Sequence, residues 1–108
     1  MFARNVSLHL KPNTPFSQFT QKFDSDVLPM LRKQNGFKHE VTLINAAGTD
    51  VTAISLWDEK KNAEAYDRTG YPEVLKVLGT IIEGTPTVVS SEVGSSTFGS
   101  NSSNRASA

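Results

Sequence analysis

Two histidines are the side chains of this sequence best suited to acid–base chemistry. His9 and His39 are the only side chains whose ordinary pKa lies near neutrality, so each is a candidate general base. The chain contains no cysteine, which excludes thiol catalysis, thiolate metal sites and disulfides. No carboxylate completes a catalytic triad with either histidine. The candidate catalytic residues are therefore His9 and His39 themselves.

The sequence indicates neither a metal site nor a bound cofactor. His9 and His39 are expected on strands that a third strand separates, which places their backbones roughly 10 Å apart, too far for a shared metal. Asp24 and Asp26 are two residues apart on a predicted helix, so they point to different sides of it. The glycines have turn or cap positions, and none forms a phosphate-binding loop.

Three aromatic side chains are candidates for contact with a substrate. Trp57 is the single tryptophan; indoles serve cores more often than active sites, so it is interpreted either as buried packing or as a pocket wall. Tyr66 and Tyr71 flank a predicted helix break at Gly70, where a hydroxyl over an apolar pocket would orient a phenolic substrate. We expect a pocket between sheet and helices, bounded by these three side chains, with the break acting as a gate.

Length and charge narrow the classes of function. The chain has 108 residues, with eleven basic and eleven acidic side chains and no net charge, which predicts one domain without a nucleic-acid or membrane-surface patch. The N-terminus alternates polar and apolar residues and does not resemble a signal peptide, and no run is long enough to span a bilayer. These features predict a cytoplasmic protein.

The first half of the chain predicts a strand, a helix and a hairpin. Apolar residues alternate over 4–10, which is typical of a strand with one apolar face. Thr14 and Pro15 predict a helix start, and the apolar stripe continues to Leu31 past a bend at Pro29. Gly36 should end that helix, after which strands are expected at 37–45 and 51–57 around a turn at 46–50.

The second half predicts a two-part helix and a last strand. Asp58 is expected to cap the second helix, and Pro72 to begin a third, whose apolar stripe reaches Ile82. Gly84 and Pro86 should stop it, and 87–93 reads as the final strand. We therefore predict a folded domain at 1–93 and a disordered Ser/Gly/Asn-rich tail at 94–108.

This order of elements predicts an α+β, ferredoxin-like βαββαβ fold with the first and third strands in the centre of the sheet. Both helical segments should cover one face. The other face would expose an apolar patch too large for a monomer, made by alternate members of the set Val41, Leu43, Ile44, Ile54, Leu56, Val88 and Val89. A homodimer through the sheet faces is therefore expected.

Three segments resemble the antibiotic biosynthesis monooxygenase family: Val27 to Phe37, Ser55 to Tyr66, and the strand after Glu83 to Pro86. The resemblance covers roughly residues 2–93. It implies a dimeric α+β barrel, and the activities it suggests are cofactor-free oxygenation of quinols or aromatic polyketides and, in one branch, haem degradation. The haem branch would have an asparagine on the first strand, a tryptophan in the second helix and a histidine in the third.

Only part of that haem pattern is present. Asn5 is on the first strand, on the face opposite Val6, and it remains a candidate substrate contact. Tyr66 stands at the helical tryptophan position, and Lys76 at the histidine position. Haem degradation is therefore disfavoured. Trp57 matches a tryptophan that many family members carry at the end of the third strand.

Two functional hypotheses follow from the sequence. The first is a small cofactor-independent monooxygenase, whose apolar pocket holds an electron-rich aromatic substrate that itself activates oxygen. The second is a non-catalytic dimeric barrel that binds a small apolar ligand or acts as an interaction module, which needs no acid–base group. An enclosed cavity with a histidine or tyrosine hydroxyl on its wall would favour the enzyme, and a filled core the alternative.

Overall fold

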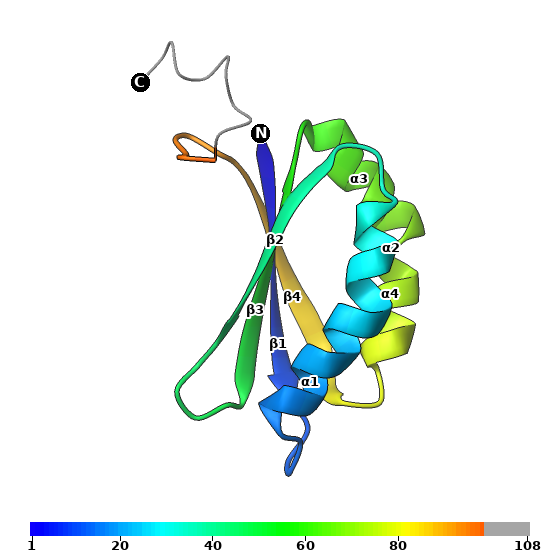
Figure 1. The fold of residues 1–108 in the computed structure, drawn as a ribbon, viewed down its shortest axis with the longest axis vertical. Helices are drawn as coiled ribbons and strands as arrows, with labels where there is room; N and C mark the ends of the chain where they lie inside the picture. The colour runs from blue at the N-terminus through cyan, green and yellow to red at the C-terminus, as the bar shows by residue number, and fades with distance from the viewer. Residues whose placement is uncertain (99–108) are drawn as a thin grey trace.

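Four antiparallel strands form one sheet in the order β2-β3-β1-β4, and the helices lie on one side of it (Figure 1). The computed structural model describes residues 1–98. Its elements are β1 (Phe2–Leu10), α1 (Phe16–Lys22), the π-helical turn η1 (Phe23–Val27), α2 (Leu28–Arg32), β2 (Phe37–Ile44), β3 (Asp50–Trp57), α3 (Lys60–Thr69), α4 (Tyr71–Leu78) and β4 (Ile82–Glu92). The predicted ferredoxin-like fold is confirmed, with β1 and β3 in the centre.

The alternation of β1 decides which side chains face the helices. Its even-numbered residues point into the layer between sheet and helices and are buried: Phe2, Arg4, Val6, Leu8 and Leu10. Its odd-numbered side chains from Asn5 to His9 lie on the open face of the sheet, because successive residues of a strand point to opposite faces. One charged residue, Arg4, therefore lies within the apolar row.

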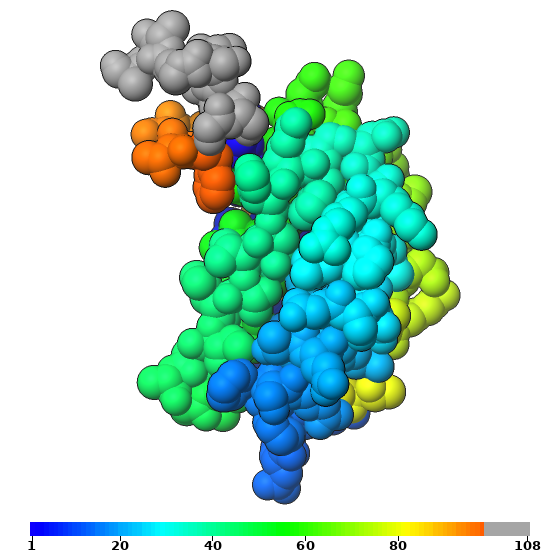
Figure 2. Space-filling model, in the orientation of Figure 1, coloured from blue at the N-terminus to red at the C-terminus, as the bar shows by residue number. Residues whose placement is uncertain are grey.

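The first helix differs from the prediction at its start and in its middle. Thr14 does not cap it; Pro15 occupies the N-cap without a side-chain hydrogen bond. The N–H of Leu28 bonds to the carbonyl of Phe23, five residues back. This wide turn directly precedes Pro29, which has no N–H to donate and whose ring would crowd a regular helix. Figure 2 shows these helical segments lying against the β2 edge.

The start of α3 is fixed by a residue other than the one predicted. Glu59, not Asp58, is the N-cap, and it forms a capping box with Asn62. The Glu59 N–H donates to Asn62 Oδ1 over 3.1 Å, while Asp58 instead pairs with Lys38 at 3.4 Å. Glu59 takes this position because its side chain and that of Asn62 satisfy each other's backbone donors.

Replacing Gly36 with alanine should destabilise the protein by about 2 kcal/mol. Gly36 has a φ of +80°, and an added Cβ would lie 2.3 Å from Cγ of Asn62, so the substitution strains the backbone and displaces the capping side chain. Chemical denaturation measures the change. Gly94→Ala is the control, because nothing lies within 4 Å of a Cβ there. Equal stability of the two variants would contradict this account of the cap.

The last strand begins earlier than predicted. Helix α4 ends at Leu78, and β4 already starts at Ile82, so the expected helix to Ile82 and strand at 87–93 are wrong at that boundary. Gly84 has a φ of +73° and lies beside a register shift in the β1–β4 pairing. The glycine therefore accommodates an irregularity inside a long strand instead of ending a helix.

The open face of the sheet carries exposed apolar side chains. Val41 is 46% exposed, Leu43 52% and Val89 56%. On this face the Phe98 ring stacks on His39, with 4.5 Å between ring centroids. The remainder of the predicted tail, 99–108, lies outside the described residues. Within residues 1–98, no helix is long and apolar enough to cross a membrane.

Candidate active site

A cavity of about 40 Å³ lies between the sheet and the helices. Most of its wall is apolar and comes from β1, η1, α2, β3 and α4. Its polar wall residues are Arg4, Glu40, Ser55, Tyr66 and Tyr71. The predicted pocket and this cavity lie in the same layer, and both tyrosines of the prediction line it.

Arg4 brings a permanent positive charge to this apolar layer. Its side chain is 3% exposed, and one guanidinium nitrogen donates to Asp67 Oδ1 at 2.5 Å. The guanidinium carbon lies 4.2 Å from the centre of the Tyr71 ring and 5.2 Å from that of Tyr66. These are cation–π distances. Because a guanidinium has five N–H donors, this group can also bind an anion at the cavity.

The two tyrosines remain neutral hydroxyls at physiological pH. Burial raises the pKa of Tyr66 far above its ordinary value, although the nearby Arg4 charge acts to lower it. Burial likewise raises the pKa of Tyr71, and Arg4 again opposes the shift. Gly70 leaves room for the Tyr66 ring, because a Cβ there would come within 2.8 Å of it. Both phenols are thus hydrogen-bond donors at the wall.

Glu40 is the carboxylate of the cavity. It lies on the helix-facing row of β2, where its Oε2 accepts a hydrogen bond of 2.7 Å from the Thr42 hydroxyl. Burial is the main cause of its raised pKa; the bond from Thr42 opposes the shift, and the charge of Asp24 adds to it. A carboxylate with a raised pKa is a stronger base than an exposed one, so Glu40 has the properties of a proton acceptor.

Glu40→Gln should raise the melting temperature by a few degrees at about pH 7 but not at about pH 4. A carboxyl with a raised pKa in the folded state contributes stability below its unfolded pKa, and that contribution is lost as the pH rises through the folded pKa. Glutamine cannot ionise and removes this loss. The exposed Glu64→Gln is the control for thermal melts. A parallel pH dependence of native protein and Glu40→Gln would contradict the assignment.

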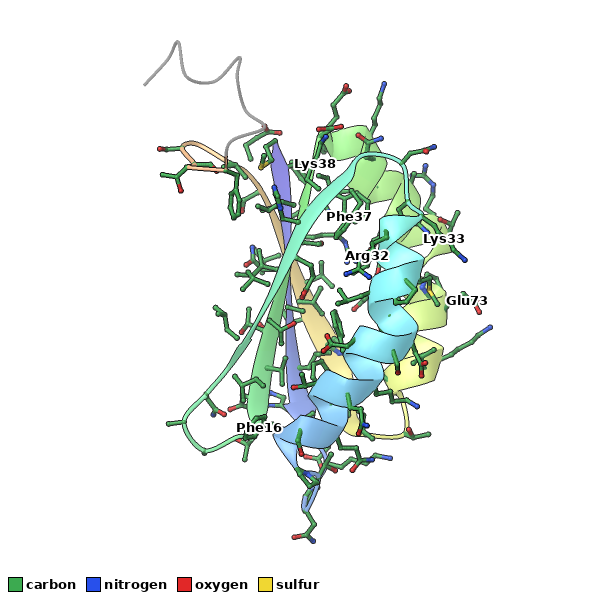
Figure 3. The ribbon with its side chains drawn as sticks, in the orientation of Figure 1. Phe16, Arg32, Lys33, Phe37, Lys38 and Glu73 are labelled. Carbon is green, nitrogen blue, oxygen red and sulfur yellow. The ribbon has the colours of Figure 1, made fainter. Side chains whose placement is uncertain are left out.

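Trp57 lies behind Tyr66 and does not line the cavity. It is fully buried, its Nε1–H donates to Ser55 Oγ over 2.9 Å, and its ring stacks on Tyr66 with 5.0 Å between centroids. The Phe37 ring packs edge-on against the indole, with 5.6 Å between ring centroids. Figure 3 shows Phe37 at the start of β2, between the sheet and the helices. Trp57 thus supports a wall residue of the cavity.

His9, His39 and Asn5 lie on the open face, away from this cavity. The strand pairing shows this placement for two of them, since Asn5 pairs with Ile54 and His39 with Leu56. His9 Nδ1 contacts Asp50 Oδ1 and its side chain is 70% exposed. Either histidine could act as the base of this pocket only if its strand turned the side chain toward the helices. The alternation of β1 and β2 turns both side chains to the opposite face of the sheet.

Arg4 and Glu40 are site residues that are not among the candidates predicted from the sequence. Both left a signal in the pattern of their strand. Arg4 shares the parity of Val6 and Leu8, and a charge within an apolar row is a functional signal because burying it is costly. Glu40 shares the parity of Ile44, which packs against the core. Within residues 1–98, no group of three or more His, Asp or Glu side chains is placed to hold a metal ion.

Comparison with solved structures identifies the fold. A monooxygenase of Streptomyces coelicolor in complex with nanaomycin D matches with a TM-score of 0.73 and 15% identity over 88% of each chain. The cofactor-independent oxygenase SnoaB of Streptomyces nogalater matches at 0.70 and 12% identity, over 90% of this chain and 96% of that one. A protein of Nitrosomonas europaea assigned to the antibiotic biosynthesis monooxygenases matches at 0.70 and 14%, over 88% and 100%. No family model and no curated protein matches the sequence.

Proposed function

We propose, from the fold that this chain shares with antibiotic biosynthesis monooxygenases, that it is a small cofactor-independent monooxygenase of an aromatic phenol or quinol. The observation that carries the proposal is the buried guanidinium of Arg4, held between two phenol rings at the wall of an apolar cavity. A buried cation is costly unless an anion compensates it. The anion of an ionised phenolic substrate would strengthen that compensation during the reaction.

The residues of the cavity have different roles in such a reaction. Glu40 accepts the proton of the substrate, and Arg4 stabilises the resulting oxyanion by charge and hydrogen bonding. The hydroxyls of Tyr66 and Tyr71 add neutral donors. The apolar wall excludes water, which strengthens these interactions and protects reactive intermediates.

The substrate supplies the electrons in this scheme. For an anthrone, the ring CH₂ becomes C=O, and the four electrons released reduce one O₂. One oxygen atom enters the product, and the other leaves as water with the two hydrogens of the CH₂ group. No external reductant is needed. The protein's part is to generate and hold the anion that reacts with oxygen.

Oxygen uptake with a panel of hydroquinones and anthrones tests this function. The native protein should accelerate uptake by at least one panel member above the rate in buffer. Tyr66→Phe should lower that rate, whereas His9→Ala and His39→Ala, on the open face, should leave it unchanged. Failure of every panel member, or full activity of Tyr66→Phe in a folded protein, would refute the proposal.

One observation favours a second candidate, the non-catalytic barrel that binds a small apolar ligand or acts as an interaction module: the space between the sheet and the helices is nearly filled. The cavity, at about 40 Å³, is smaller than the roughly 150 Å³ in which a dry apolar cavity binds benzene. Saturable binding of aromatic compounds without oxygen uptake would support this candidate. Because the cavity is smaller than an aromatic substrate, the enzyme hypothesis requires the cavity to open when the substrate binds.

We also propose that two copies associate through their open sheet faces. The exposed Val41, Leu43 and Val89 form an apolar surface that a monomer would leave in water. Val41→Asp should weaken association at least tenfold, because it buries an unpaired charge. Phe16→Asp is the control, since Phe16 is 51% exposed on α1, away from that face. An 11.8 kDa monomer in sedimentation of the native protein at micromolar concentration would contradict the dimer.

A further inference from the structure

Arg4 separates the cavity from a second, larger hollow. A groove of about 610 Å³ runs between α3 and the β1–β4 side of the sheet, and Arg4 lines both spaces. Phe2 and Val88 give this groove an apolar floor, and the charged side chains of α3 form its rim. The guanidinium of Arg4 therefore occupies the position where the two spaces would join.

The size of the cavity makes this position important. At about 40 Å³ it has room for water but not for an aromatic ring, for which roughly 150 Å³ is needed. The groove is large enough and open to solvent. A ring that enters from the groove must pass the guanidinium of Arg4, so the contacts that hold Arg4 control access.

Asp67 is the partner that holds Arg4 in place. The pair joins a 3% exposed guanidinium to a carboxylate that is 56% exposed. Water can solvate Asp67 once the pair opens, whereas the buried guanidinium then needs another anion as its partner. The Tyr66 and Tyr71 rings, which stack on Arg4, lie on either side of the α3–α4 junction at Gly70. Arg4 could thus change its ionic partner while it keeps aromatic contacts.

The charges around the groove indicate what would replace Asp67. The lining has three cationic residues, Arg4, Lys60 and Arg68, against the two carboxylates Glu64 and Asp67. A negatively charged ligand group matches this excess of positive charge. A carboxylate suits the guanidinium in particular, because the two can form paired hydrogen bonds.

We infer that Arg4 is a gate, and that the ligand is an aromatic compound with a carboxylate, whose anionic group replaces Asp67 on Arg4 as its ring passes from the groove toward the cavity. This inference rests on the proposed function for the identity of the site. It adds the entry route, the class of ligand and the role of Asp67. Asp67 competes with the ligand and does not take part in chemistry.

Equilibrium binding of two probes to the full-length protein tests the gate. The probes are 1-hydroxy-2-naphthoate, which carries a carboxylate, and neutral 1-naphthol. Asp67→Asn keeps the shape of the side chain but removes its charge, so it should tighten binding of the naphthoate about tenfold. Binding of naphthol should change less than about twofold, because it does not compete for the charge.

Two further variants complete the design. Glu64→Gln removes a carboxylate from the same groove that has no ion pair with Arg4 among the described residues, so it should tighten binding of the naphthoate less than about twofold and leave that of naphthol unchanged. Arg4→Met should abolish the preference for the naphthoate. The inference is overturned if Asp67→Asn behaves like Glu64→Gln, or if Arg4→Met retains the preference while its thermal melt shows a folded protein.

The binding assay and the oxygen assay test the gate and the oxygenase independently. Selective tightening by Asp67→Asn without oxygen uptake from any substrate would refute the oxygenase and leave the gate standing. Oxygen uptake combined with an unchanged naphthoate affinity in Asp67→Asn would do the reverse.

Discussion

Arg4→Met is expected to lower oxygen uptake by about 10²- to 10³-fold with any substrate that the native protein accepts. The guanidinium is the permanent charge on the cavity wall, and stabilisation of a developing oxyanion by a fixed donor has effects of this size. Methionine has a similar length and is apolar, so it removes the charge and the donors with little change in volume. Oxygen-electrode rates at saturating substrate measure the loss.

The fold should survive this substitution. Removing one partner of an ion pair is costly when the other charge is left buried and unpaired. The partner of Arg4, Asp67, is 56% exposed, so water can solvate the carboxylate that is left. Arg68→Met, in the same groove but exposed, is the matched control and should keep the native rate. A folded Arg4→Met variant with native activity would show that this charge has no part in catalysis.

Trp57→Ala should lower the free energy of unfolding by about 3–5 kcal/mol. The indole is fully buried between Tyr66 and Phe37, and its removal leaves a void that surrounding side chains can only partly fill. The hydroxyl of Ser55 also loses its hydrogen-bond donor. Denaturant unfolding at fixed protein concentration measures the change.

A second aromatic substitution separates the effect of burial on stability from the effect of losing a ring. Phe98→Ala removes a ring that is 43% exposed and should cost much less than Trp57→Ala. A loss below about 1 kcal/mol for Trp57→Ala would contradict the packing described around it. In that case the supporting role given to Trp57 behind Tyr66 would be wrong.

The fold could be predicted from the sequence because its elements carry strong periodic signals. Alternation in β1, and the spacing of Phe19, Phe23 and Val27, each agree with a single secondary structure. The end of α4 could not be placed, because Leu78, Ile81 and Ile82 fit a helical stripe as well as a turn followed by a strand. Glu59 and Asp58 are both plausible caps, and the choice depends on where Asn62 lies in three dimensions.

The site was less predictable than the fold. The helix break at Gly70 predicts the two tyrosines at the pocket, and both line the cavity. The ordinary pKa of histidine predicts His9 and His39 as bases, but the parity of their strands takes them to the open face. The proposed role of Arg4 depends on its contacts with Tyr71 and Asp67. Both residues are more than sixty positions away in the sequence, so local patterns give no indication of these contacts.

Fluorescence of Trp57 gives the most direct test of the central claim, that an aromatic ligand binds between the sheet and the helices. Trp57 is the only tryptophan and stacks on Tyr66, which lines the cavity, so a quinone bound there should quench its emission on contact with the tyrosine. Titration of the native protein with a naphthoquinone should show saturable quenching in the micromolar range. Quenching that rises linearly without saturation, or no quenching at all, would contradict the claim.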